Sequence, residues 1–436
     1  MQGTIFKELK VANWRQFLSV EIEFHPQLTV LTGVNGAGKS TLLNILTNHL
    51  GISRPYLGVP NRSDIGERFL TGVLRAGGKI FSWLTGHRSH ISNHDYIGEI
   101  IYENGATAKL SVPKDVGLQY GVHIENQQSM LGFHMPSHRE MPIYRAVPYV
   151  SFSGTDPRDA FQQLISFNYT AYAGHRPDGS VLFSLKQILI NWAAIGEGNS
   201  TFKPDPRQFQ AYTGFVEILK KILPRELGFT GLSISAPEIL IETQSGTFLI
   251  DSASGGLTTL IEIAALIYTC SLKADVVGNS FVVTFDEPEN HLHPSLQRSL
   301  LPALIEAFPQ VQFIVATHSP FMVSSLRDSF VYALRHNQYE VPDASSLPYR
   351  PASRWVESTR LDHANRAGPA SEILRDVLGV PVTLPAWVQR DLEEIVEKYA
   401  ARGLDDAMIA ELRSDVDKAG LNDLFSDAVS MLARGR

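Results

Sequence analysis

Short apolar runs along this chain predict buried strands. Residues 28–32, 281–285 and 311–316 consist almost entirely of aliphatic, aromatic and β-branched side chains. Runs of this length without polar alternation are typical of strands that are covered on both faces of a sheet. Because such runs alternate with helical patterns between residues 236 and 335, the sequence predicts an α/β fold with a mixed or parallel central sheet.

Helical spacing of apolar residues is clear in several segments. It predicts helices at 40–46, 209–223 and 260–268, and another that begins near Ser295. Residues 97–102 and 106–112 instead resemble two strands, and the intervening Asn104-Gly105 pair predicts a β-hairpin. No sustained heptad pattern is present, so we expect no long coiled-coil arm.

The pattern divides the chain into five segments. They are 1–50, with strands and a first helix; 51–235, an inserted α+β region; 236–335; 336–370, polar and linker-like; and 371–436, a helical C-terminal tail. In the tail, one apolar helical face is formed by Val388, Leu392, Ile395, Val396 and Tyr399.

Composition limits the possible classes. The 436 residues are 44% hydrophobic with a formal net charge of −7, so binding to nucleic acid would need a local basic patch. The single cysteine, Cys270, sits in an apolar run and suits a reducing cytoplasm. We find neither a signal-peptide pattern nor an uninterrupted apolar run long enough to span a bilayer, and we expect a cytoplasmic protein without a membrane.

Residues 33–40 read GVNGAGKS and match the phosphate-binding pattern G-x-x-x-x-G-K-S. A buried strand precedes them and a helix follows, as a phosphate loop requires, although a chance glycine-rich turn is the alternative. Lys39 would reach the β- and γ-phosphates, and Ser40 would hold Mg²⁺. The predicted nucleotide contacts here are Gly33, Asn35, Gly36, Gly38, Lys39, Ser40 and Thr41.

Two further strand ends carry candidate catalytic groups. The strand at 281–285 delivers Asp286 and Glu287 at its carboxyl end, where ligands bind in open α/β sheets. Asp286 would hold Mg²⁺ and Glu287 would act as general base, although two solvated acids at a strand end are common. His318 ends the strand at 311–316 and is poised to contact the γ-phosphate and the attacking water.

Ser254, Gly255 and Gly256 open the helix at 260–268 and form a second candidate anion site. A hydroxyl, bare amides and a helix N-terminus favour negative charge, although Ser-Gly-Gly is also an ordinary turn and cap.

Together these motifs resemble the ABC-type ATPases, which use the same order of phosphate loop, Ser-Gly-Gly signature, Asp-Glu strand and switch histidine. The run DEPENHLHP at 286–294 is similar to the branch that contains the overcoming-lysogenisation-defect nucleases and the Septu and retron-linked ATPases of anti-phage systems. RecF-like and SMC-like ATPases are more distant kin. Residues 9–17 and 20–24 also resemble the N-terminal strand pair of these families, in which an arginine such as Arg15 lies near nucleotide or DNA.

The resemblance implies ATP and Mg²⁺ as cofactors and a homodimer or higher oligomer. ATP on Lys39 of one subunit would be capped by Ser254, Gly255 and Gly256 of another. A glutamine between the two lobes usually senses the metal, and the candidates are Gln127, Gln128, Gln162 and Gln163.

Several departures separate the chain from transporter ATPases. Ala253 and Leu257 flank the signature where a leucine and a glutamine are expected, and residues 290–294 lack the Ser-Gly-Leu-Asp sequence of transporters. The tail is too short for the second domain of the nuclease relatives, and we interpret Asp415 and Asp417 as a solvated helix face. We therefore expect a separate effector protein, a nuclease or a toxin, that this ATPase regulates in anti-phage defence.

Other functions and sites stay open. A DNA-repair or recombination ATPase that binds DNA directly is the main alternative, and a transporter subunit is a third. The segment 135–139, with nearby Arg145, is either a basic contact to phosphate or DNA or a solvated loop. His291 and His293 lack the spacing of a zinc helix, which favours local packing or dimer contacts over a metal site.

Overall fold

The structure is a computed structural model in which two compact units are separated at Ala370/Ser371. Each unit is described by itself. The described residues are 4–63, 66–73, 93–114, 116–139, 143–148, 156–172, 179–200, 203–277, 280–338, 354–363, 366, 368–378, 386–399 and 406–434.

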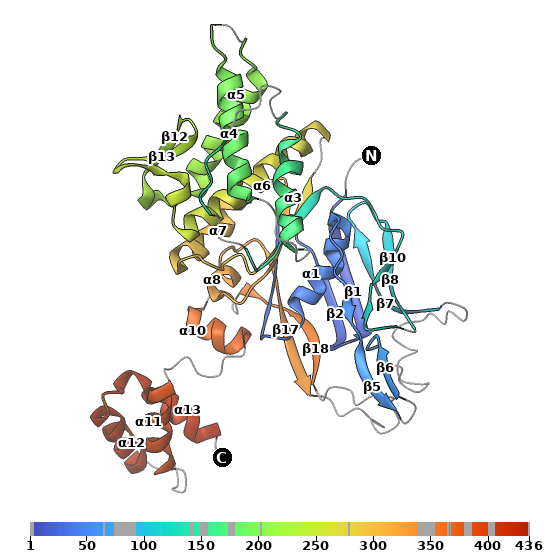
Figure 1. The fold of residues 1–436 in the computed structure, drawn as a ribbon. Helices are drawn as coiled ribbons and strands as arrows, with labels where there is room; N and C mark the ends of the chain where they lie inside the picture. Colours follow the sequence, from blue (N-terminus) through green and yellow to red (C-terminus); the bar gives the residue numbers. More distant parts are fainter. Residues whose placement is uncertain are drawn as a thin grey trace. The chain divides into compact units, whose positions relative to one another are not determined.

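An eleven-stranded sheet organises the first unit (Figure 1). Its strand order is β10-β8-β7-β1-β2-β18-β17-β3-β16-β15-β11. From β17 to β11 all neighbouring strands are parallel. The bounds of this half are β17 (Phe330–Gln338), β3 (Leu28–Gly33), β16 (Val311–Ala316), β15 (Phe281–Asp286) and β11 (Gly132–Met135).

The other half of the sheet is an antiparallel meander. Its strands are β1 (Phe6–Trp14), β2 (Phe17–Glu23), β7 (His94–Tyr102), β8 (Thr107–Pro113) and β10 (His123–Glu125). The β7–β8 pair confirms the predicted hairpin, and β1–β2 confirms the predicted N-terminal strand pair. Because β7 pairs with β1, the hairpin is part of the main sheet rather than of a separate insertion.

The strand β18 (Arg354–Arg360) joins the two halves of the sheet. It pairs antiparallel with β17 and parallel with β2. The interpretation of residues 336–370 as linker-like misses this strand, because its residues mix charged, polar and aromatic side chains without an apolar run. Residues 339–353 of that segment lie outside the described part of the chain.

The parallel register brings four carboxyl ends to one edge of the sheet. Asp286 pairs with Ala316, Ala316 pairs with Leu31, and Met135 pairs with Phe285. The segments that follow β3, β15, β16 and β11 therefore start side by side. These segments carry the phosphate loop, Glu287, His318 and residues 136–139.

The helices fall into two groups in Figure 1. Helix α1 (Lys39–Thr47) follows β3 and contacts the sheet, whereas α3 to α6 pack against one another in a helical layer. The remaining bounds in this unit are α3 (Ala160–Tyr172), α4 (Val181–Glu197), α5 (Pro206–Ile222), α6 (Gly255–Val277), α7 (Pro294–Ala307) and α8 (Pro320–Val323). The predicted helix at 209–223 and the predicted start near Ser295 are confirmed within one turn. The helix predicted at 260–268 is confirmed, but it is longer and spans Gly255–Val277.

A three-stranded antiparallel sheet lies between α5 and α6 in sequence. It consists of β12 (Phe229–Ser235), β13 (Glu238–Thr243) and β14 (Gly246–Leu249), and the short helix η3 (Ile250–Ser252) leads from it into α6. Two small antiparallel pairs complete the strands, β4 (Tyr56–Leu57) with β9 (Gln119–Tyr120) and β5 (Val59–Ser63) with β6 (Gly66–Leu70).

Helix α6 is the one described helix that is long and apolar enough to cross a membrane. Within Gly255–Ala274, 83% of the apolar stretch is buried inside the protein. Cys270 lies there and is fully buried. A helix that is apolar all round and covered by protein is a core helix, and α6 is one here.

The second unit is helical. It contains α10 (Ala370–Glu372), which starts at the boundary, then η5 (Ile373–Val377), α11 (Ala386–Glu397), α12 (Asp406–Lys418), η6 (Asn422–Leu424) and α13 (Phe425–Arg434). The predicted apolar face of Val388, Leu392, Ile395, Val396 and Tyr399 is buried in its core, together with Met408, Leu412 and Val416.

Candidate functional site

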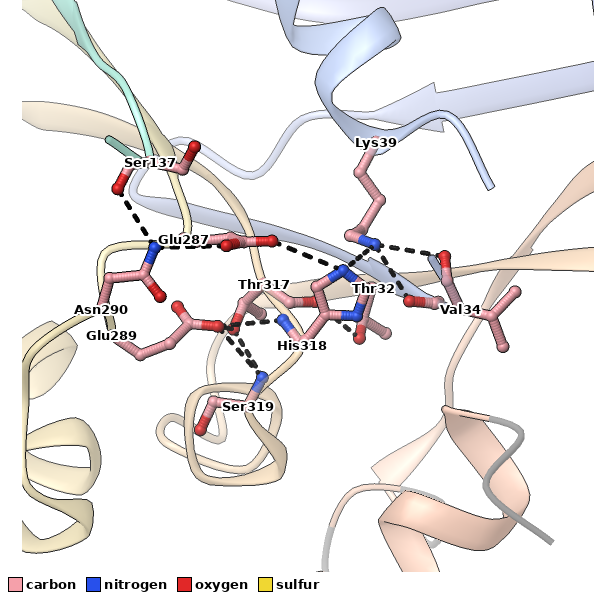
Figure 2. A network of polar contacts seen from close by, with 11 residues as sticks. Thr32, Val34, Lys39, Ser137, Glu287, Glu289, Asn290, Thr317, His318 and Ser319 are labelled. Carbon is pink, nitrogen blue, oxygen red and sulfur yellow. Dashed lines mark hydrogen bonds and ion pairs between the residues drawn. The ribbon is translucent and has the colours of Figure 1, made fainter. Parts of the chain in front are cut away.

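The phosphate loop holds Lys39 in a nearly buried position. The Lys39 Nζ atom donates to the carbonyl oxygens of Gly33 (3.0 Å) and Val34 (3.4 Å), and lies 2.7 Å from His318 Nε2 (Figure 2). Only 5% of the residue is exposed. The Lys39 ammonium is thus bonded to carbonyl oxygens of its own loop. The oxygens of a bound phosphate would be stronger acceptors at this position.

Backbone geometry explains the glycine at the start of α1. Gly38 has φ 96°, in the left-handed region, and its Cα faces the ring of Phe17 and the amide of Gln16 so closely that a Cβ would clash. Glycine is the residue that tolerates both conditions. The β1–β2 turn is therefore packed directly on the phosphate loop, as the resemblance to ABC-type ATPases implies for this turn.

Arg15 lies in that turn and contacts residues of β4 and β9. Its guanidinium donates to the carbonyl of Leu57 (3.0 Å) and the hydroxyl of Tyr120 (3.3 Å) and stacks on the rings of Trp14 and Tyr56. These contacts fasten β4 and β9 to the turn beside the phosphate loop.

Glu287 and His318 face each other across the ends of β15 and β16. Glu287 Oε1 lies 3.6 Å from His318 Nε2, and both side chains are about one-third exposed. The backbone of Glu287 has φ 51°, although its amide still donates to the carbonyl of Ala316 (2.8 Å). A left-handed conformation in a non-glycine residue costs on the order of 1–3 kcal/mol and concentrates at functional sites.

Burial determines the charges of the lysine and the histidine. It lowers the pKa of Lys39 to about 8, against the opposing effects of Glu287 and Asp286. It also lowers the pKa of His318, as does the neighbouring Lys39, while Glu287 acts the other way. At neutral pH, a Lys39 pKa of about 8 and a lowered His318 pKa favour a contact in which the Lys39 ammonium donates to His318 Nε2.

Glu289 fixes the segment that carries His318. Its Oε1 atom accepts from the Thr317 hydroxyl (2.5 Å) and from the amides of His318 (3.0 Å) and Ser319 (3.2 Å) (Figure 2). Burial raises the pKa of Glu289, and the Thr317 hydroxyl opposes that change. Sequence reasoning missed this residue, because its role depends on how β15 and β16 pair in the sheet.

Ser40 and Asp286 line one cavity of about 270 Å³. Burial raises the pKa of Asp286, and a hydrogen bond from Ser40 opposes this effect. A hydroxyl and a carboxylate are oxygen ligands of the kind that Mg²⁺ takes from proteins, with the rest supplied by water and phosphate. In the described part of the chain no three His, Cys, Asp or Glu side chains cluster around a metal position.

The Ser-Gly-Gly signature lies at the start of α6. Ser254 is exposed and is absent from the described residues that line the Ser40 cavity. A Cβ on Gly256 would lie 3.2 Å from the carbonyl oxygen of His291, so this glycine permits close packing of α6 on the loop after Glu287.

A buried lysine holds the segment that precedes the Ser-Gly-Gly signature. Lys186 on α4 is fully buried, and its Nζ atom lies 2.6 Å from Asp251 Oδ2 and 2.8 Å from Glu238 Oε2. It also donates to the carbonyl of Arg145 (3.1 Å). Asp251 stands three residues before Ser254, so this ion cluster ties the approach to the signature to α4 and β13.

The two interpretations of the segment 135–139 apply to different residues, because His138 and Arg145 are exposed whereas Arg139 is not. Arg139 Nη2 donates to the carbonyls of Asn290 (2.9 Å) and Pro288 (3.3 Å), so Arg139 is neither a solvated residue nor an open contact for phosphate or DNA. The Arg145 guanidinium stacks on the Phe183 ring, 4.7 Å from its centre. Ser137 and His138 line the cavity that contains Ser40 and Asp286.

The four candidate glutamines do not line this cavity in the described structure. Gln127 donates to the carbonyl of Asn48 and Gln128 to that of Asn126, whereas Gln162 and Gln163 lie on α3.

The remaining candidates have local roles. His293 Nδ1 contacts the Ser295 hydroxyl at the start of α7, and His291 supplies the carbonyl that Gly256 approaches. Asp415 accepts from the Tyr399 hydroxyl (3.0 Å) and from Lys418 (3.3 Å) on the surface of α12, which agrees with a helix face rather than a metal site.

The fold and the site define a protein with a phosphate loop, an Asp-Glu strand end and a strand-end histidine around one sheet edge. Residues 28–324 match the family described as "AAA domain, putative AbiEii toxin, Type IV TA system". This match covers more than half of the chain, and the chain belongs to that family.

Known relatives agree with this assignment. The chain is 26% identical to "Retron Ec83 probable ATPase" of Escherichia coli across 96% of this chain and 88% of that protein. It is 25% identical to "Septu protein PtuA" of Bacillus thuringiensis across 37% of this chain and 40% of that protein. The expected relationship to retron-linked and Septu ATPases is thereby confirmed.

Among solved structures, the SMC head domain from Thermotoga maritima is similar at 12% identity and a TM-score of 0.40. The alignment covers 82% of this chain and 99% of that structure.

Proposed function

We propose that this protein binds and hydrolyses ATP, that two copies pair around the nucleotide, and that the pairing regulates a separate effector protein, a nuclease or a toxin, in anti-phage defence. The observation that supports this most is the meeting of Lys39, Glu287 and His318 within 3.6 Å contacts, from segments far apart in sequence. The membership in the AAA-type family and the similarity to a retron ATPase support the same reading.

Hydrolysis would use the residues in distinct roles. ATP phosphate would replace the loop carbonyls as the acceptor for Lys39, with the amides at the start of α1 as further donors. Ser40 and Asp286 would hold Mg²⁺, which supplies positive charge to the phosphate oxygens. Glu287 would accept a proton from the attacking water while His318 contacts the γ-phosphate, and ADP and inorganic phosphate would leave.

Pairing would complete the site. Ser254 is exposed at the N-terminus of a long helix and lies outside the described lining of its own Ser40 cavity, so it is free to face the nucleotide of another copy. In such a head-to-tail dimer, Ser254, Gly255 and Gly256 would contact the γ-phosphate across the interface. We place this assembly in the cytoplasm.

The experiment is ATP turnover together with oligomeric state. Glu287→Gln should bind ATP with Mg²⁺, lose roughly 10²–10³ in rate, and accumulate as a dimer in size-exclusion chromatography with light scattering. Turnover at the parent rate by Glu287→Gln would remove the general-base role. In cells, expression with the neighbouring genes should protect against phage, and absence of protection would contradict the defence role. Lys39→Ala should abolish protection; equal protection by this variant would show that defence does not depend on the nucleotide site.

A further inference from the structure

The two oxygens of the Glu287 carboxylate have different neighbours. Asn290 Nδ2 donates to Glu287 Oε2 (3.2 Å) and also to the backbone carbonyl of Ser137 (3.1 Å) (Figure 2). The other oxygen, Oε1, faces His318. One amide group therefore fixes one carboxylate oxygen and leaves the second directed toward the histidine.

Arg139 in turn holds the backbone around Asn290. Arg139 Nη2 donates to the carbonyl of Asn290 (2.9 Å) and to that of Pro288 (3.3 Å). The segment after β11 and the loop after β15 thus exchange hydrogen bonds in both directions. This clasp, which we define as Ser137, Arg139, Glu287 and Asn290, is possible because β11 and β15 are parallel neighbours that end at the same edge.

Part of the Arg139 guanidinium is buried. The Nε and Nη1 atoms of Arg139 are buried without a hydrogen-bond partner among the described residues. Burial lowers the pKa of Arg139, and the carboxylates of Glu262 and Glu289 oppose that change. Glu262 is buried on α6, the helix that Ser254 precedes. A buried guanidinium that is bound to two carbonyls and lies near two acids has little freedom to move.

We propose that Asn290 is a positioning residue for Glu287, and that Arg139 holds the Asn290 backbone in the place this requires. The inference rests on the proposed ATPase function, because it assigns Asn290 to the alignment of the general base. Without the amide, the partly exposed carboxylate would rotate among several conformers, and only a fraction would direct Oε1 toward the attacking water. A misplacement of about 1 Å at a reacting group can lower a rate about 10²-fold.

The test uses two substitutions of the same residue. Asn290→Asp keeps the shape but cannot donate to Glu287, and Asn290→Ala removes the side chain. Both should lower kcat roughly 10- to 100-fold while KM for ATP changes less than about threefold, because Lys39 and the phosphate loop are untouched. Asn337→Ala is the matched control, since its Nδ2 atom also donates to a glutamate, Glu357 (2.6 Å), on β17 and β18. This control should keep the parent kcat.

A double-mutant cycle separates positioning from a structural role. If Asn290 acts through Glu287, Asn290→Ala should lower the rate of Glu287→Gln less than about twofold, because the group it orients is already gone. Multiplicative losses, or a rise in KM equal to the fall in kcat, would overturn the inference. So would Asn290→Asp turnover at the parent rate. If the parent protein does not hydrolyse ATP at all, the proposed function fails instead, and the two failures are distinct.

Discussion

The Lys39 Nζ atom lies 2.7 Å from His318 Nε2, so the phosphate loop and the end of β16 are in direct contact. The lysine also satisfies two carbonyls of its own loop. Lys39 is thus held in a buried position between acceptors that a phosphate group can replace. The contact joins the phosphate loop, the first motif along the chain, to His318, the last.

Removal of this lysine should weaken nucleotide binding. A charge-assisted hydrogen bond contributes about 1.5–3 kcal/mol, so Lys39→Ala should bind ATP roughly 10- to 100-fold more weakly. Isothermal titration calorimetry with Mg²⁺ and a non-hydrolysable ATP analogue measures this change. Lys10→Ala, which removes a partly exposed lysine on β1, should bind like the parent. Unchanged affinity in Lys39→Ala would remove this lysine from the nucleotide site.

The buried ion cluster around Lys186 should matter for both stability and pairing. Lys186→Met leaves the carboxylates of Glu238 and Asp251 without their shared cation, and breaking a buried pair costs about 3–5 kcal/mol. Urea denaturation should show a loss of this size, and ATP-dependent dimers of the variant should be weaker because Asp251 precedes the signature.

The exposed pair of Lys220 and Glu217 provides the control for that prediction. Its atoms are 2.7 Å apart, but both side chains are well exposed. Lys220→Met should change the free energy of unfolding by less than about 0.5 kcal/mol. A Lys186→Met variant as stable as Lys220→Met would show that the cluster is not a structural support.

His49 should contribute a pH dependence to stability. Burial lowers its pKa to about 4, against the effect of a hydrogen bond to the Leu46 carbonyl. Its Nδ1 atom donates to that carbonyl and its Nε2 accepts from the Tyr102 hydroxyl (2.7 Å), which requires the neutral ring. The unfolded chain takes up a proton at about pH 6.5 and the folded one does not, so stability falls as pH decreases from about 6.5 to 4.

The measurement is the free energy of unfolding of the parent and of His49→Gln across that pH range. The variant should be less stable at pH 7 and should lose less stability toward pH 4, so the difference between the two proteins narrows with acid. His123 is exposed on β10, and the curve of unfolding free energy against pH for His123→Gln should run parallel to that of the parent. Parallel curves for His49→Gln as well would contradict a buried neutral histidine.

Much of this site could be predicted from the sequence because its reactive residues lie in short, recognisable motifs. Lys39 stands in a pattern that only a phosphate loop needs, and Glu287 and His318 each end a recognisable apolar strand. The order of these strands is enough to place all three residues at one sheet edge. The same reasoning predicted the β7–β8 hairpin from Asn104 and Gly105.

The residues that hold the site in place could not be found in this way. The contacts of Asn290, Arg139 and Lys186 depend on the register of β11 against β15 and on the packing of α4 near β13. Such long-range contacts leave no local pattern, so Arg139 resembled a surface arginine in the sequence. The strand β18 was missed for a similar reason, since its pairing with both β17 and β2 compensates for a weak apolar pattern.

A nucleotide site that is shared between two copies of the protein leads to one direct prediction. Lys39→Ala should disable a site through its phosphate loop and Ser254→Arg through its signature, and each variant alone should be inactive. In an equal mixture, roughly half of the dimers combine one copy of each variant, and one of their two sites is intact. ATP turnover of the mixture should therefore recover to roughly a quarter of the parent rate. Activity no higher than the average of the two separate variants would contradict a shared nucleotide site.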